Sequence, residues 1–216
     1  MLSVFNRPKQ LVEQKNGEDI VVNCKMNEAV YLYKCTQCRV ILPDRAAKFV
    51  MDSCEDIDVQ IAGGLVTGTV EILKCQRAKL VIKTGVSIPT YTLESCQDID
   101  IALDAAASQV ETIYFLNATN IRVICPSANH TISLPDGTDP SQQCVANRTS
   151  TGFTVERVVR EGIGYPTTEV KKEAAEKRTK LLKKKIQEMV EESIQVTTTA
   201  KDESAQESSD TAAAKN

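Results

Sequence analysis

A short motif recurs about every twenty residues through the first two thirds of the chain. Each copy has two alternating apolar residues, then a small Cys or Ala, then three more alternating apolar residues. The first copy runs from Val30 to Leu42 around Cys35, and the small residue recurs at Cys54, Cys75, Cys96 and Ala118. The steps between these positions are 19, 21, 21 and 22 residues. A fixed period of this length is typical of a solenoid.

The alternation inside each copy is the two-residue period of a strand with one face buried and one face wet. Each repeat therefore reads as two short strands that meet at a corner, where a small side chain fits. Stacked repeats bury a continuous interior and pair each strand with those above and below it. A helix-turn-helix repeat would need a period of 3.6 and longer units. The sequence predicts an all-β fold, a right-handed parallel β-helix with a C-terminal α-helical tail.

The chain has 216 residues, a net charge of −3 and 25% charged residues, which fits one soluble domain with appendages. No apolar run approaches the length of a membrane span, and the apolar start at Met1 is too short for a signal peptide. We therefore expect a cytosolic protein.

The cysteine pattern favours buried thiols over disulfides or metal binding. Four of the eight cysteines fall at the predicted corners, one coil apart, where they would act as small apolar core residues. Cys35 and Cys38 form a CxxC, but Cys38 occupies a slot that is apolar in later repeats, and no second CxxC exists. We expect no metal site.

Four segments are predicted: a leader (1–19), the β-helix domain (20–165), a charged helix (166–196) and a disordered tail (197–216). The polar stretch 138–150 is expected to be a long loop. Thr168 is a candidate N-cap for the helix, which holds eight basic and two acidic residues between Lys171 and Lys185. The last segment is rich in Ser, Thr, Ala and acidic residues, which is typical of disorder.

Residues for catalysis are sparse. The only histidine, His130, stands alone in a predicted loop, and no phosphate-binding glycine motif occurs. Outward positions of the repeats instead alternate acidic and basic side chains, without the basic excess or the aromatics that nucleic-acid binding needs. The sequence thus predicts a binding protein that is not an enzyme, has no cofactor and does not bind nucleic acid.

Several stretches resemble the C-terminal β-helical domain (the CARP or C-CAP domain) of adenylyl cyclase-associated proteins. The resemblance covers roughly residues 8–135, and its clearest stretches are AVYLYKCTQCRVIL, FVMDSCEDIDVQI, GTVEILKCQRAKLVIKTGVSIPTYTLESC and NATNIRVICP. It implies a cytoskeletal protein that binds monomeric actin, prefers the ADP form and promotes exchange of the actin nucleotide.

The resemblance also implies two sets of site residues. Actin contacts are expected on outward strand positions, at Lys74, Arg77, Lys79 and Lys83. The family domain forms homodimers by exchange of a C-terminal hairpin, and Phe153, Val155, Val158 and Val159 are the candidates for that role. The helical segment after Thr168 replaces the strand-like C terminus usual in the family.

Two other functions stay open. Tubulin cofactor C belongs to the same superfamily and stimulates GTP hydrolysis with an arginine finger. Gln76-Arg77 and Gln37-x-Arg39 resemble that motif in part, without an adjacent His. A scaffold is the other alternative, in which the basic helix docks a cytoskeletal or ciliary partner.

Overall fold

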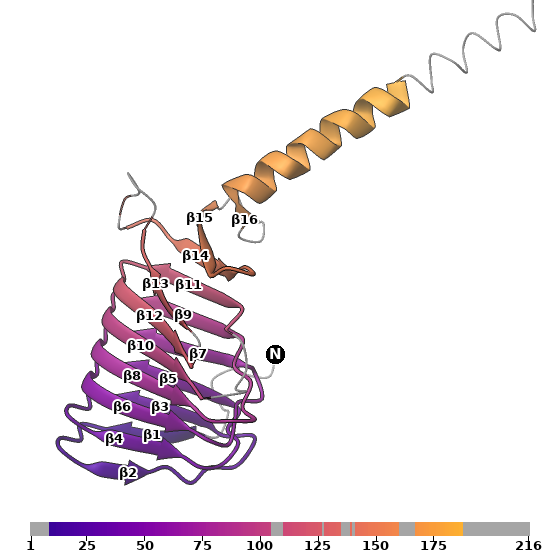
Figure 1. Ribbon diagram of the computed structural model, residues 1–216. Coiled ribbons are helices and arrows are strands. Elements are labelled where there is room, and N and C mark those ends of the chain that lie inside the picture. The colour runs from indigo at the N-terminus through magenta and orange to yellow at the C-terminus, as the bar shows by residue number, and fades with distance from the viewer. Residues whose placement is uncertain are drawn as a thin grey trace, which may run out of the picture. The chain divides into compact units, whose positions relative to one another are not determined.

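The structure is a computed structural model that describes residues 9–104, 110–126, 128–134, 139, 141–159 and 167–187. The chain divides into two compact units, Met1–Thr168 and Glu169–Asn216. The first unit is a stack of parallel coils, and each coil contributes one strand to each of two sheets (Figure 1). The predicted all-β parallel β-helix followed by a C-terminal helix is therefore confirmed.

The first sheet has nine strands. Its first six are the odd-numbered strands from β1 to β11, and each of them pairs in parallel with the next one in this order. These six are β1 (Lys9–Glu13), β3 (Ala29–Tyr33), β5 (Lys48–Asp52), β7 (Thr69–Leu73), β9 (Thr90–Glu94) and β11 (Thr112–Leu116). The three strands that follow are antiparallel: β14 (Cys144–Arg148), β15 (Phe153–Val159) and β16 (Thr167–Thr168).

The second sheet has seven strands, and six of them are parallel. These are β2 (Asp19–Val21), β4 (Arg39–Leu42), β6 (Glu55–Ile61), β8 (Gln76–Ile82), β10 (Gln97–Leu103) and β12 (Thr119–Cys125). The seventh, β13 (Ala128–Ile132), folds back antiparallel to β12.

Equivalent residues of successive repeats stack in register along the stack. Phe49 pairs with Val30 on one side and with Val70 on the other, and Tyr91 follows Val70. All four side chains are fully buried. The alternating sequence pattern therefore builds one continuous apolar core between the two sheets.

The corner cysteines form a column of reduced, buried thiols, as the sequence predicted. The thiol of Cys75 donates to the carbonyl of Leu73 at 3.1 Å, and its Sγ accepts from the backbone N–H of Cys54 at 3.4 Å. Burial raises the pKa of Cys35 and Cys96. These thiols satisfy backbone groups at the bend and fill space there.

Two residues with left-handed backbone conformations flank each corner. Around Cys75 these are Lys74 and Arg77, both with φ of 51°. The same two positions have positive φ around Cys54 and Cys96, in all cases at residues other than glycine. This conformation is unfavourable for residues with a side chain, so the stacking on both sides must impose it.

The stack begins and ends differently from the sequence prediction. Lys9–Glu13, assigned to a leader, forms β1 and pairs with β3, so the first coil already includes these residues. Cys144–Arg148, expected in a long loop, forms β14 and pairs with β11. Its first three residues are buried, and this strand covers the end of the core.

The second unit contains a helix over residues 169–187. Thr168 immediately precedes the helix, at the position expected for an N-cap. Val170, Leu181, Leu182 and Ile186 are exposed on the helix. The described helix is not long and apolar enough to cross a membrane. The predicted continuation of the helix over 188–196 and the predicted disordered tail lie outside the described residues.

Candidate functional site: the outer face of the second sheet

The four residues expected to contact actin lie along a single coil. Lys74 sits at the corner before β8, Arg77 and Lys79 lie on β8, and Lys83 follows this strand. The first three are exposed, and Lys83 is half-buried. They therefore form a line across the outer face of the second sheet.

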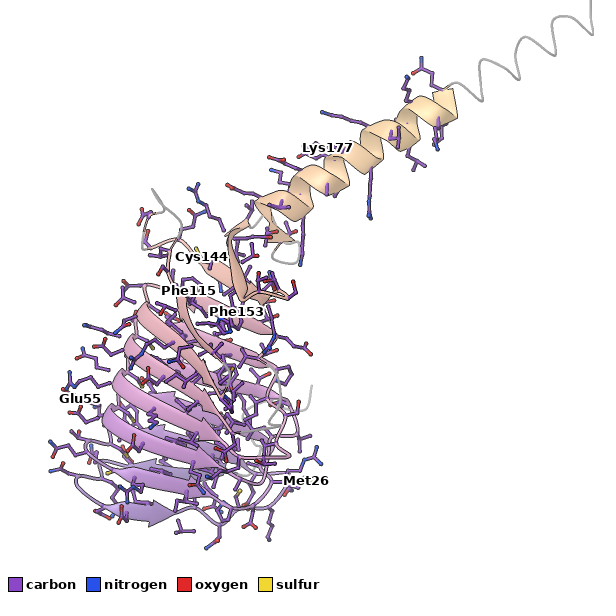
Figure 2. All side chains as sticks on the ribbon, viewed as in Figure 1. Met26, Glu55, Phe115, Cys144, Phe153 and Lys177 are labelled. Carbon is purple, nitrogen blue, oxygen red and sulfur yellow. The ribbon has the colours of Figure 1, made fainter. Side chains whose placement is uncertain are left out.

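Arg77 is held by two carboxylates of the preceding coil. Its Nε lies 2.6 Å from Oδ1 of Asp56, its Nη2 lies 3.1 Å from Oδ2 of the same residue, and it also pairs with Glu55. Figure 2 shows Glu55 projecting outward from the stack. The hydrogen bonds from Arg77 hold the pKa of Asp56 below its ordinary value, and those with Asp56 and Glu55 raise the pKa of Arg77. This guanidinium is oriented by the bidentate geometry.

Lys83 also has an acidic partner, because its Nζ lies 3.3 Å from Oδ2 of Asp104. Lys79 stands between Asp58 on β6 and Asp100 on β10 in the strand register. The site is therefore a surface of mixed charge and not a basic patch, and a partner must offer groups of both signs.

Lys79 belongs to a longer row of charges, which we call the charge ladder. One residue comes from each parallel strand of the second sheet, and neighbours in the row are register partners. The members in order are Asp19, Arg39, Asp58, Lys79, Asp100 and Arg122. The sign alternates at every step, which places opposite charges on neighbouring strands. Arg122 and Asp100 form an ion pair with Nη2 and Oδ2 at 2.6 Å.

A second row, which we call the apolar column, runs beside the charge ladder two residues further along each strand. Its members in order are Val21, Ile41, Gln60, Val81, Ala102 and Ile124. Val21 is 58% exposed, and the others are half-buried. A hollow at the two rows is lined by Arg39, Ile41, Asp58, Val59, Gln60, Lys79 and Val81.

The four residues expected in a dimer interface lie on β15. Phe153 and Val155 pack against the core of their own chain, and Val158 is buried. The ring of Phe153 meets that of His130 edge to face, with centroids 5.8 Å apart (Figure 2 labels Phe153). Val159 is half-buried. β15 is thus paired with β14 of the same chain, and the expected strand exchange stays a prediction.

No group of three or more metal-ligating side chains occurs among the described residues. The CxxC is buried, since Cys38 is 3% exposed and its thiol donates to the carbonyl of Thr36 at 3.2 Å.

His130 lies on β13 next to Phe153, in a strand and not in the expected loop. Sequence reasoning missed the pairing of Arg77 with Asp56, although the 21-residue step between them equals the repeat length.

Stacked coils with a thiol corner and an exposed charged sheet define a β-solenoid domain. The family described as "Adenylate cyclase associated (CAP) C terminal" matches residues 5–144, and the chain belongs to this family. Members of the family generally bind actin. A crystal structure of cyclase-associated protein from Cryptosporidium parvum is similar in fold, with a TM-score of 0.54 and 15% identity over 72% of this chain and 93% of that chain. No curated protein matches the sequence.

Proposed function

We propose that this protein binds monomeric actin, prefers the ADP form and promotes exchange of its nucleotide, as a cytoskeletal protein of the cytoplasm without catalytic chemistry of its own. The observation that carries the proposal is the family match across the whole stack of parallel coils. The exposed, mixed-charge outer face of the second sheet offers the binding surface.

The mechanism would be differential binding. A partner that prefers a more open actin conformation shifts the population toward it, and the nucleotide then leaves faster. The β-helix suits this role because each strand is hydrogen-bonded to a neighbour on both sides through most of the stack. A rigid surface of this kind loses little freedom on binding, so more of the interaction energy is available to hold the open actin.

Lys74, Arg77, Lys79 and Lys83 are proposed as the actin contacts. Lys74 is exposed at the corner before β8. Arg77 is already oriented by Asp56 and Glu55, so it could meet an acidic actin group with little further ordering.

The test is the rate at which a fluorescent nucleotide leaves ADP-actin, with and without this protein. Faster release at substoichiometric protein is expected. A variant with all four basic residues changed to Glu is expected to lose the effect, whereas Lys25→Glu, on an exposed loop, should retain it. Unchanged activity in a folded quadruple variant would overturn the choice of face, and no binding by the unmodified protein would overturn the function.

A GTPase activator is less well supported, because neither Gln76-Arg77 nor Gln37-x-Arg39 has the adjacent His of the arginine-finger motif. A GTP hydrolysis assay run in parallel tests it directly.

A docking role for the helix has one supporting observation. The apolar side chains Val170, Leu181, Leu182 and Ile186 are exposed on a strongly basic helix. If actin binding survives removal of residues 169–216, the β-helix binds actin without the helix, and the helix would dock a different partner.

A further inference from the structure

The helix over residues 169–187 concentrates positive charge in a chain that is otherwise acidic. It holds eight basic and three acidic residues, whereas the rest of the chain holds 18 basic and 26 acidic residues. Every residue of the helix is exposed except Lys172, which is half-buried. Figure 2 shows side chains projecting from the helix on several sides, with Lys177 labelled. The helix is therefore the part of the chain to which an anionic partner would be drawn.

The three acidic residues of the helix share one side of it. An α-helix advances about 100° per residue, which places Glu169, Glu173 and Glu176 within about 60° of one another. Glu173 also has a basic partner one turn further on, since its Oε2 lies 3.8 Å from Nζ of Lys177. The opposite side of the described helix therefore carries no carboxylate.

This opposite side, which we call the carboxylate-free face, combines aliphatic and basic side chains. It spans about 160° around the helix axis. Its large aliphatic side chains are 53–61% exposed and form two rows, Val170 with Leu181 and Leu182 with Ile186. Between these rows, at intervals of seven residues, lie the basic side chains of Lys171, Arg178 and Lys185. Contact with an apolar environment would remove the aliphatic groups from water, which is favourable.

We propose that the carboxylate-free face binds the surface of a membrane that contains anionic lipids, with the helix parallel to the membrane plane. The aliphatic side chains enter the boundary between the headgroups and the acyl chains, and the basic side chains contact the lipid headgroups. Lys and Arg have long aliphatic stems, so their charged ends reach the headgroups while the stems lie along apolar surface. The three cations within the face hold the helix at a shallow depth.

The width of the face favours a flat surface over a groove in a protein. A helix in a coiled coil presents a narrow apolar stripe, and a helix in a protein groove presents one row of apolar anchors. Here the two aliphatic rows lie about 130° apart around the axis. Cations occur both between the rows and beyond them, and many mobile headgroups can meet such a spread without fixed partners. An anionic lipid surface is therefore the occupant that fits both the apolar and the charged side chains.

The expected binding is reversible and sensitive to salt. Four aliphatic side chains on one helix give a modest anchor, so the attraction between the basic residues and the anionic lipids is needed as well. Salt screens that attraction. The proposal does not rest on actin binding, because the helix shares no residue with the four basic positions proposed as actin contacts.

The test is co-sedimentation of the full chain with lipid vesicles, at low and at physiological salt and without actin. Vesicles of phosphatidylcholine alone are compared with vesicles that also contain phosphatidylserine. The protein should bind only the vesicles with phosphatidylserine, and more weakly as salt rises. Equal binding to both kinds of vesicle would overturn the proposal. Binding to neither would overturn it too, and would leave an acidic protein as the partner of the helix.

Two double variants with the same loss of charge test the choice of face. Arg178→Gln, Lys185→Gln removes two cations of the carboxylate-free face and should weaken vesicle binding about tenfold. Lys180→Gln, Lys183→Gln removes two cations from the side of the acidic residues and should weaken it much less. Gln is a good helix former, so the helix should persist in both variants. Equal losses of affinity would contradict the assignment of the face.

A third variant tests the aliphatic rows without any change of charge. Leu181→Gln, Leu182→Gln, Ile186→Gln should lose most of the binding at physiological salt, where attraction between charges alone is screened. Far-UV circular dichroism would confirm that the helix and the β-helix are retained. Undiminished binding by this folded triple variant would refute insertion of the aliphatic side chains, and with it the proposed mode of membrane binding.

Discussion

Arg77 and Asp56 join the corners of two successive coils, with Arg77 Nε 2.6 Å from Oδ1 of Asp56. Both residues have left-handed backbone conformations, with φ of 51° and 52°. In these conformations equivalent side chains of successive coils project side by side, which brings together two residues that lie 21 positions apart in the sequence. The same corner position forms a second link where Asn120 donates to Asp98.

Arg77→Ala is expected to raise the pKa of Asp56 toward its ordinary value, because the hydrogen bonds from the guanidinium hold it down. A lowered pKa in the folded state stabilises the fold at neutral pH, and that contribution disappears as the pH falls through the folded-state pKa. NMR titration of the carboxyl groups would measure the shift. Asp139, whose pKa is lowered by Ser141, should be unchanged in the variant. An unchanged pKa of Asp56 would contradict the role of Arg77.

Tyr91→Phe is expected to leave the stability unchanged or to raise the free energy of unfolding by about 1 kcal/mol. The side chain is fully buried in the core, and its hydroxyl has no hydrogen-bond partner in the described structure. Removing an unsatisfied buried polar group removes its desolvation penalty. Urea denaturation would measure the change, with Tyr114→Phe on the half-buried outer face as control. A clear loss of stability would show that the hydroxyl is satisfied.

Gly63→Ala is expected to destabilise the β-helix by about 3 kcal/mol or more, since a rigid backbone would have to move. A Cβ at this position would lie 2.0 Å from the carbonyl carbon of Asp44 in the preceding coil. Gly17→Ala is the matched comparison, since its added methyl group would meet nothing within 4 Å and only its φ of 66° is unfavourable. We expect that change to cost about 1 kcal/mol. Similar costs in chemical denaturation would contradict the clash.

The corner thiols are expected to resist labelling in the folded protein. All four corner thiols are buried, so a reagent cannot reach them in the folded protein. Burial also raises the pKa of Cys35 and Cys96, which leaves little reactive thiolate at these two positions. Cys24 and Cys125 are only half-buried, so a thiol reagent at pH 8 should reach these two first. Burial, with the nearby Asp44 and Glu28, also raises the pKa of Cys24, so the expected contrast with the corner thiols is one of access. The corner cysteines should become reactive only in denaturant. Rapid modification of Cys96 in the native protein, located by mass spectrometry, would show that the coils open readily.

Much of the fold was predictable because its information is local and repeated. The spacing from Cys35 to Cys54 and onward sets the coil length, and the alternation on either side selects the inward residues. The charged outer face follows from the same alternation. The prediction of a loop at Cys144–Arg148 was wrong, because this strand is short, lies outside the repeat and gains its stability from pairing with β11.

The sequence by itself determined the period of the solenoid, the core residues and the thiol corners, because burial follows directly from an apolar period of two. Only the tertiary structure decided which residues of different coils become neighbours. It joined Arg77 to Asp56, forced residues such as Lys74 into left-handed conformations and aligned Asp58 with Lys79 in one row. The physical reason is that these relations depend on the register between coils, which cooperative hydrogen bonding and packing along the whole stack establish.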